Sequence, residues 1–252
     1  MTAIRKAILL AAGRGKRLGD LTAHRPKPML EIAGAPIIAH VLEGLAQAGI
    51  EQAIVVTGYL GEQIEDFCRR FESRGDHLAI TTVRQPTLNG TGGAMIAAMP
   101  LIGADPRFVF GWGDVLMDHE FYQRFMMQAN ASGYDLLLAV NRTRDPSAGA
   151  AVYVDAAMRV ERIVEKPQPG ASTTNWNNAG LFASTTALLD YVARLKPSPR
   201  GELELPAAIA AMIEDGRIVR AAELRGFWSD IGTPEDLERA RHLFKPRAIP
   251  PE

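Results

Sequence analysis

Short apolar runs alternate with segments of helical periodicity through the first 140 residues, and this alternation constrains the fold more than any other feature. A run such as residues 5–11 (RKAILLA) ends close to a glycine and suits a buried parallel strand. Segment 36–48 instead repeats its apolar residues at helical spacing. The predicted strands are 5–11, 53–57, 78–84, 107–111 and 134–140, and the predicted helices are 36–48, 61–72, 92–99 and 119–130. This order predicts an α/β protein with a Rossmann-like, mostly parallel twisted sheet covered by helices on both faces.

After residue 141 the pattern loosens, and a small antiparallel insertion is expected. Residues 150–154 and 159–164 alternate in polarity across a turn at 155–157. Further on we expect strands at 178–184 and 217–223 and helices at 185–194, 204–215 and 234–243, the last capped by Thr233 with Asp236 three residues later. We therefore predict one domain over 1–245, with a nucleotide-binding part to about 115, a sugar-binding part from about 116, and a proline-rich tail at 246–252.

Charge and cysteine content exclude several classes of protein. The chain has 252 residues with 28 Lys and Arg against 29 Asp and Glu, so it lacks the basic excess of nucleic-acid and membrane-surface proteins. The single Cys68 excludes an internal disulfide, and the apolar run after Lys6 is too short for a signal peptide. No stretch approaches the length of a membrane span. A cytoplasmic protein is expected, and a homo-oligomer is compatible with this composition.

A glycine-rich, basic loop follows the first strand. Gly13 and Gly15 let backbone N–H groups turn toward an anion, while Arg17 and Lys27 add positive charge. The spacing does not match the Walker pattern. It does not match the dinucleotide fingerprint either, because Leu18 stands where that fingerprint needs a third glycine. We expect an extended arm to lay Lys27 back over a phosphate-binding loop. The alternative is a solvated basic loop with no ligand.

Six further motifs follow this loop in order along the chain. The loop itself reads LAAGRGKRL from residue 10, with Lys27-Pro28 after it. The others are QPTLNGTGGAM at 85–95, FGWGDVLMD at 110–118, IVEKP at 163–167, NNAGLFA at 177–183, RGELEL at 200–205 and WSDIGTPEDLERA at 228–240. Together they resemble the signatures of the sugar-phosphate nucleotidylyltransferases over most of the chain. The resemblance implies an enzyme in which a sugar 1-phosphate attacks the α-phosphorus of a nucleoside triphosphate and releases pyrophosphate.

The resemblance also implies a set of catalytic and metal-binding residues. Asp114 and Asp230 would hold Mg²⁺, which takes a few carboxylate oxygens together with phosphate oxygens and water. Arg17 and Lys27 would hold the β- and γ-phosphates, and Lys166 would face the sugar phosphate or the α-phosphate. Taken singly, each aspartate could instead be a turn or helix-cap residue, and Lys166 a solvated lysine at a hairpin end.

The remaining expected contacts divide between base and sugar. The nucleotide-binding residues implied are Ala11, Ala12, Gly13, Gly15, Gln85, Gly90 and Thr91, where Gly90 leaves room for a ring and Thr91 caps the helix at 92–99. The sugar-binding residues implied are Gly149, Glu165, Asn178, Gly180 and Glu202, where Gly180 lets the sugar ring approach. Ala150 competes with Gly149 for one of these places. Of two tryptophans beside the motifs, Trp112 and Trp176, we expect Trp176 to be the better cover for a sugar face.

The substrates remain open within this class. LAAG and RGELEL favour UTP, then dTTP, with a hexose or amino-sugar 1-phosphate destined for cell wall or polysaccharide. TGGA at 91–94 keeps a guanylyltransferase for a mannose- or heptose-type sugar as an alternative. A non-catalytic regulatory relative is a second alternative, although such proteins usually lose one of the phosphate-binding or metal-binding residues. A nicotinamide oxidoreductase is disfavoured by the absent third glycine.

Overall fold

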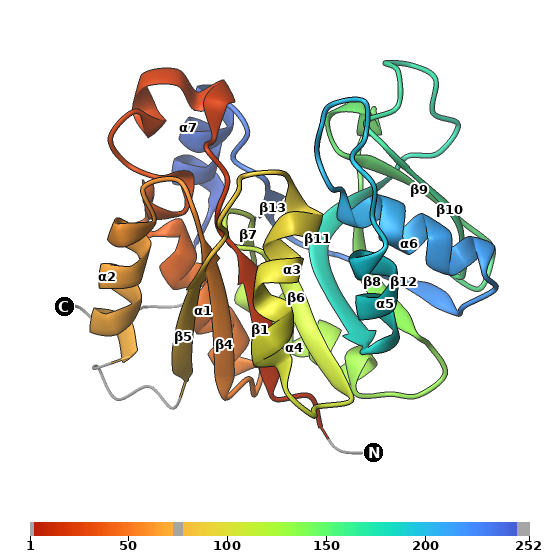
Figure 1. Cartoon of the computed structure of the whole chain (residues 1–252). Helices are drawn as coiled ribbons and strands as arrows, with labels where there is room; N and C mark the ends of the chain where they lie inside the picture. The colour runs from red at the N-terminus through yellow and green to blue at the C-terminus, as the bar shows by residue number, and fades with distance from the viewer. Residues whose placement is uncertain (1–2, 73–77, 246–252) are drawn as a thin grey trace.

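A nine-stranded sheet organises the molecule in the computed structural model, which describes residues 3–72 and 78–245 (Figure 1). The order along its main path is β10-β9-β11-β6-β1-β4-β5, while β8 pairs with β11 and β12. Its strands are β1 (Lys6–Leu10), β4 (Gln52–Thr57), β5 (Ala79–Arg84), β6 (Arg107–Trp112), β8 (Leu136–Arg142), β9 (Ala150–Val154), β10 (Val160–Glu165), β11 (Trp176–Thr185) and β12 (Val219–Glu223). Strands β6, β1, β4 and β5 are mutually parallel, whereas β11 runs antiparallel to β6 and β8.

Helices cover both faces of this sheet, and each face has its own apolar core (Figure 1). Strand β1 explains the division, because Leu9 packs into one core while Ile8 and Leu10 pack into the other. The helices are α1 (Ile37–Gln47), α2 (Gly61–Glu72), α3 (Thr91–Ile102), α4 (His119–Ala129), α5 (Ala187–Ala193), α6 (Leu205–Glu214) and α7 (Pro234–Leu243). Helices α1, α2, α4 and α7 contribute to the first core, and α3, α5 and α6 contribute to the second.

The predicted fold class is confirmed, and each predicted strand and helix has a counterpart within a few residues. The turn at 155–157 also forms, because the Asp155 carboxylate accepts hydrogen bonds from the Ala157 and Arg159 amides at 2.8 Å each. Thr233 and Asp236 form the expected capping box at α7. The proline-rich tail lies outside the described residues. None of the helices in residues 3–72 and 78–245 could cross a membrane.

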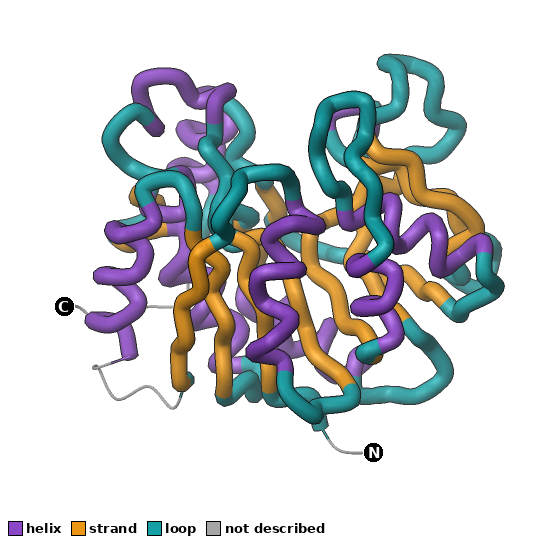
Figure 2. The backbone as a smooth tube through the Cα atoms, viewed as in Figure 1, coloured by secondary structure: helices purple, strands orange, loops and turns teal. Residues whose placement is uncertain are grey.

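Short elements without a clear periodic signal were not predicted, except that the segment at Trp228 before Asp230 is strand-like in the sequence. They are the one-turn or two-turn 3-10 helices η1 (Lys16–Thr22), η2 (Lys27–Met29) and η3 (Pro146–Ala148), and the two-residue strands β2 (Glu31–Ile32), β3 (Ala35–Pro36), β7 (Leu116–Met117) and β13 (Trp228–Ser229). The pair β7–β13 matters most, because it ties the chain after Asp114 to the chain before Asp230. The loops that follow the parallel strands β1, β4, β5 and β6 lie at the same edge of the sheet (Figure 2).

Candidate active site

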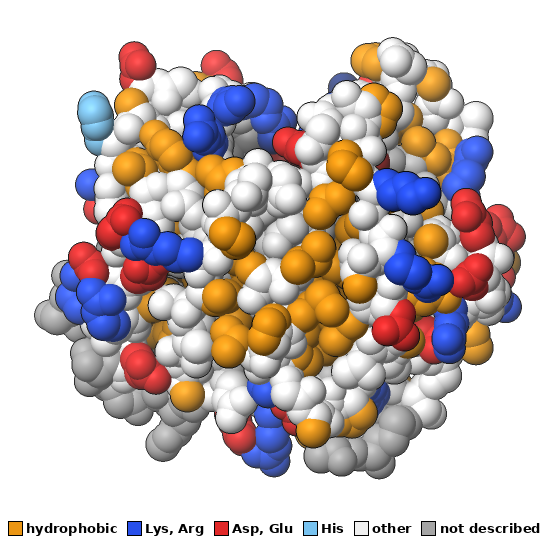
Figure 3. All heavy atoms as spheres, viewed as in Figure 1, with side chains coloured by type: hydrophobic (Ala, Val, Ile, Leu, Met, Phe, Trp, Pro, Cys, Tyr) orange, Lys and Arg blue, Asp and Glu red, His pale blue; other side chains and the backbone are white. Residues whose placement is uncertain are grey.

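A cleft of about 1240 Å³ lies along this edge of the sheet. Lys and Arg side chains gather on one wall of the hollow in the space-filling view (Figure 3). The predicted residues that line it are Ala12, Gly13, Gly15, Arg17, Lys27, Gln85, Gly90, Thr91, Asp114, Gly149, Glu165, Lys166, Asn178, Glu202 and Asp230. Two predicted residues do not line it. Ala11 is buried, with its amide bonded to the Val56 carbonyl as a continuation of the sheet, and Gly180 lies against a tryptophan.

Gly15 and Lys27 pack together at the cationic end of the cleft. Gly15 has a left-handed backbone (φ 62°), and a Cβ atom there would lie 3.3 Å from Cβ of Lys27. The Thr22 hydroxyl donates to the Gly15 carbonyl at 3.2 Å and closes the loop. Lys27 does lie against the loop, but the expected extended arm is wrong at this residue, because Lys27 begins the 3-10 turn η2. The preceding residue, Pro26, does have an extended backbone.

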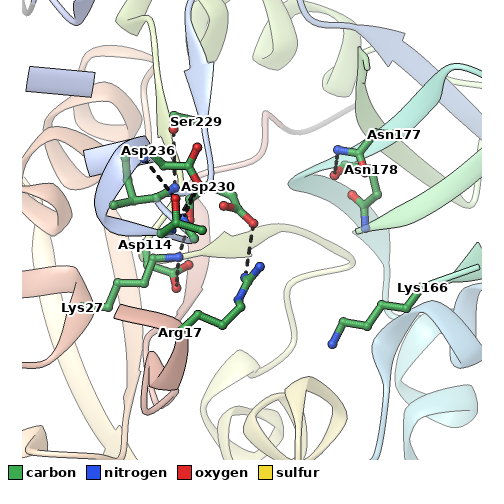
Figure 4. Close-up of polar contacts among 12 residues, drawn as sticks. Arg17, Lys27, Asp114, Lys166, Asn177, Asn178, Ser229, Asp230 and Asp236 are labelled. Carbon is green, nitrogen blue, oxygen red and sulfur yellow. Dashed lines mark hydrogen bonds and ion pairs between the residues drawn. The ribbon is translucent and has the colours of Figure 1, made fainter. Parts of the chain in front are cut away.

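Lys27 joins two aspartates that are far apart in the sequence. Its Nζ lies 3.0 Å from Oδ2 of Asp114 and also donates to the backbone carbonyl of Asp230 (Figure 4). Arg17 faces the Asp230 carboxylate, with Nη2 3.7 Å from Oδ2. The antiparallel register of β7 and β13, Ser229 opposite Leu116, brings the two aspartates to the same end of the cleft.

These carboxylates fit a magnesium ion better than a structural zinc or calcium ion. Within residues 3–72 and 78–245, no three His, Cys, Asp or Glu side chains cluster as a metal-binding group. Two carboxylates from the protein are what Mg²⁺ uses when phosphate oxygens and water complete its coordination. Lys27 and Arg17 balance the negative charge of the two carboxylates. Cations of this kind can also bind phosphate oxygens.

Asp118 is structural, as its place before α4 predicts, but it is not a side-chain cap. It holds the N-cap position without a capping hydrogen bond, and its Oδ2 accepts from the Phe227 amide at 2.7 Å. Gly226 must be small here, since a Cβ atom would lie 2.2 Å from this carboxylate. Asp118 therefore fastens the segment that leads into Trp228 and Asp230.

Gln85 marks the expected base end of the cleft. The side chain is 7% exposed, and its Nε2 donates to Asn89 Oδ1 at 3.0 Å and to the Gly90 carbonyl at 3.1 Å. Gly90 lines the cleft and has φ 101°, and a Cβ atom there would lie 2.5 Å from the Leu203 carbonyl, so the neighbouring backbone already requires a glycine. The expected Thr91 cap is wrong, because its hydroxyl accepts from the Leu205 amide at 3.0 Å and joins α3 to α6.

Glu165 lies at the other end among charged neighbours. Burial raises the pKa of its carboxyl to about 7, Lys166 opposes that shift, and Glu204 and Glu202 reinforce it. The Arg200 guanidinium lies 3.6 Å from Glu165 and 2.7 Å from Glu204. A carboxyl group that titrates near neutral pH can either donate or accept a hydrogen bond, as a sugar hydroxyl requires.

Glycines and tryptophans lie near the end of the cleft where sugar contacts are expected. Gly180 (φ 81°) has no room for a side chain, because a Cβ atom would lie 2.2 Å from the Trp112 ring. Trp112 lines the cleft, whereas Trp176 lies under the Arg142 guanidinium 4.0 Å from its ring centre and is not among the lining residues, so the preference for Trp176 is wrong. Both Gly149 and Ala150 line the cleft, and a Cβ atom on Gly149 would lie 2.4 Å from Oδ1 of Asn177.

Asn141 and Asn177 also line the cleft and were not predicted. They lie opposite each other on β8 and β11, and Asn177 Nδ2 donates to Asn141 Oδ1 at 2.9 Å. The neighbouring Asn178 accepts from the Gly180 amide at 3.0 Å, and its amide nitrogen points into the cleft (Figure 4). Asn141 directly follows the apolar run LLLAV. A polar residue at the end of an apolar strand is the sequence signal that could have identified Asn141.

Comparisons with known proteins agree with this arrangement. A family model described as "Nucleotidyl transferase" matches residues 6–245. The bifunctional protein GlmU of Methanococcus maripaludis is 31% identical over 243 residues, 96% of this chain and 55% of that protein. The mannose-1-phosphate guanylyltransferase catalytic subunit beta of Xenopus tropicalis is 33% identical over 235 residues, 92% of this chain and 62% of that protein. The chain thus spans a little more than half the length of these relatives.

A solved structure has the same fold. A UDP-glucose pyrophosphorylase complexed with UDP-glucose superposes with a TM-score of 0.84 at 22% identity, covering 95% of this chain and 97% of that one.

Proposed function

Because the chain belongs to the nucleotidyl transferase family, we propose that it transfers a nucleotidyl group from a nucleoside triphosphate to a sugar 1-phosphate. A phosphate oxygen of the sugar 1-phosphate attacks the α-phosphorus, the bond from that phosphorus to the bridging oxygen breaks, and pyrophosphate leaves. The observation that carries the proposal is the polarity of the cleft. Lys27, Arg17, Asp114 and Asp230 meet at one end, and at the other the amides of Asn177 and Asn178 lie with Glu165 and its charged neighbours, Lys166 among them.

The charged side chains can do most of what nucleotidyl transfer requires, namely positioning and charge neutralisation. Arg17 and Lys27 bind the β- and γ-phosphates and remain on the departing pyrophosphate. Lys166 points into the cleft from the opposite side (Figure 4) and binds the phosphate oxygens that the two substrates bring together. Mg²⁺ held by Asp114 and Asp230 supplies further neutralisation of the triphosphate when it is bound.

Hydrogen-bonding groups at the two ends would select base and sugar. Gln85 uses its Nε2 on Asn89 and Gly90, which leaves Oε1 to accept from an N–H group on a base edge. Glu165, Glu202 and Asn178 bind sugar hydroxyls. We propose UTP as the first nucleotide to test, followed by dTTP, with a hexose or amino-sugar 1-phosphate. GTP is the second candidate, because a guanylyltransferase is among the similar proteins.

Pyrophosphate release tests the proposal directly. Purified protein is incubated with Mg²⁺ and each of UTP, dTTP, CTP, GTP and ATP against a panel of sugar 1-phosphates. Release that needs both substrates and stops on adding EDTA would support the reaction and identify the substrates together. No release in any combination, with nucleotide binding intact by thermal shift, would reject the enzyme in favour of a binding protein.

A further inference from the structure

Two buried amides stand out among the residues that line the cleft. Asn141 is 8% exposed and Asn177 is 5% exposed, on strands that are otherwise apolar at their centres. Burying an amide costs free energy unless its hydrogen bonds are made, and even then it adds little stability over an apolar side chain of similar size. The pair is therefore poorly explained by core stability alone.

The hydrogen bonds of Asn177 fix the place of its side chain. Its Nδ2 donates to Asn141 Oδ1 and to the backbone carbonyl of Asn178, both at 2.9 Å. Asn177 also pairs with Ala151 where β11 lies antiparallel to β9. With its nitrogen held on both sides, the amide group has a single orientation, and its oxygen faces the residue that precedes β9.

That residue is Gly149. A Cβ atom on Gly149 would lie 2.4 Å from Asn177 Oδ1, so the asparagine side chain rests directly against the glycine backbone. The Gly149 carbonyl in turn accepts a hydrogen bond of 2.7 Å from the backbone amide of Lys166. A continuous path of contacts thus runs from Asn141 through Asn177 and Gly149 to Lys166.

Lys166 needs such support because its backbone conformation is unfavourable. It has φ 43°, a left-handed conformation that few residues other than glycine adopt, and it precedes Pro167, which favours an extended conformation. A residue in this state persists only where its surroundings hold it. The Gly149 carbonyl accepts the hydrogen bond of its amide.

We propose that Asn141 and Asn177 are positioning residues for Lys166. They hold the 149–166 junction so that the lysine side chain enters the cleft at the correct place, without themselves contacting the reacting phosphates. The inference rests on the proposed function, since the role of Lys166 in binding phosphate oxygens belongs to that proposal. It adds Asn141, which lies outside the sequence motifs, a role for Asn177, and a path of contacts that joins them to Lys166.

Asn141→Leu tests the path at its far end. This change removes the acceptor for Asn177 Nδ2 and keeps the number of side-chain heavy atoms, and the hydrogen bond that it breaks belongs to Asn177 rather than to Lys166. The first measurement is hydrogen exchange of the Lys166 amide in the protein without substrates. Exchange should accelerate by about tenfold or more, because the hydrogen bond to Gly149 opens more often. Unchanged exchange would overturn the proposal, whatever the catalytic activity.

A double-mutant cycle with Lys166→Ala is the second measurement. In the otherwise native enzyme Asn141→Leu should lower kcat by about tenfold or more, since small displacements of a positioned group are costly. In the Lys166→Ala background the same change should cost less than about threefold, because its target is gone. An equal cost in both backgrounds would show that Asn141 acts by another route and would refute the proposal.

Two controls separate positioning from general damage. Ser184→Ala removes another buried polar group from β11, at the end remote from the cleft, and should leave Lys166 exchange and kcat unchanged. If Asn141→Leu does not fold by circular dichroism, Asn141→Ala removes the same acceptor and replaces it in both measurements. Absence of any transfer by the unmodified protein would reject the proposed function, while the exchange measurement would still report on the path.

Discussion

Replacing Asp114 by asparagine separates the catalytic role of this carboxylate from its structural role. Asparagine removes the negative charge and keeps Oδ1 as an acceptor for Lys27, with an uncharged NH2 group in place of the second oxygen. Coulomb attraction at the observed 3.0 Å is about 5.5 kcal/mol at an effective dielectric constant of 20 and about 1.4 kcal/mol in water. Asp114 is 29% exposed, and burial of Lys27 offsets part of the attraction, so the free energy of unfolding should fall by about 1–2 kcal/mol.

The effect of Asp114→Asn on turnover should be much larger. A lost metal ligand removes about 3–4 kcal/mol of transition-state stabilisation, which is a decrease of roughly 10²–10³-fold in kcat. Pyrophosphate release at saturating substrates, titrated with Mg²⁺, measures this, and urea unfolding measures stability. Near-native kcat at ordinary Mg²⁺ concentrations would remove Asp114 from the metal site and refute the reasoning.

Asp105→Asn is the matched control. Asp105 also pairs with a mostly buried lysine, Lys6, at 2.6 Å, but lies away from the cleft. Its replacement should lower stability by about 1 kcal/mol or less and leave kcat unchanged. A comparable loss of turnover in Asp105→Asn would mean that loss of any lysine–aspartate pair impairs the enzyme, and the Asp114 result would then carry no information about metal binding.

Three other changes test further parts of the molecule. Gly149→Ala puts a methyl group 2.4 Å from the Asn177 amide oxygen, so urea unfolding should show a loss of about 1–3 kcal/mol; an unchanged midpoint would mean that the loop yields freely. Burial lowers the pKa of His40, so the unfolded chain binds a proton that the native protein binds less well. Stability should therefore fall as the pH drops through about 6.5, and urea unfolding should show a smaller fall in His40→Gln; equal falls would contradict the assignment. Burial raises the pKa of Glu165 from 4.5 to about 7, so the native protein binds the extra proton and stability should fall as the pH rises through this window. Glu165→Gln should remove that contribution in the same assay, and an identical pH dependence would contradict it.

Local interactions account for what could be predicted from the sequence. Apolar periodicity identifies the longer strands and helices because a buried strand or a helix face requires a particular spacing of side chains. The Asp155 turn and the Thr233–Asp236 capping box were predictable for the same reason, since each is closed within five residues. The motifs identified the family because they are short and follow one another in a definite order.

The reasons for particular residues within those motifs could not be predicted locally. Gly90 has no room for a side chain because of the Leu203 carbonyl, and Gly180 has none because of Trp112, whereas the sequence suggested only room for a substrate. Thr91 bonds Leu205 rather than its own helix. In each case the decisive neighbour comes from a distant segment, and no spacing rule relates the two positions.

The sequence by itself therefore determined the order of strands and helices, the α/β class and the residue types that can bind phosphate and metal. Only the tertiary structure decided which of them meet. Asp114 and Asp230 share Lys27 because β7 pairs with β13, and Asn141 meets Asn177 because β8 lies antiparallel to β11. Strand pairing between distant segments depends on how the whole sheet buries its apolar faces, and that condition involves the entire chain at once.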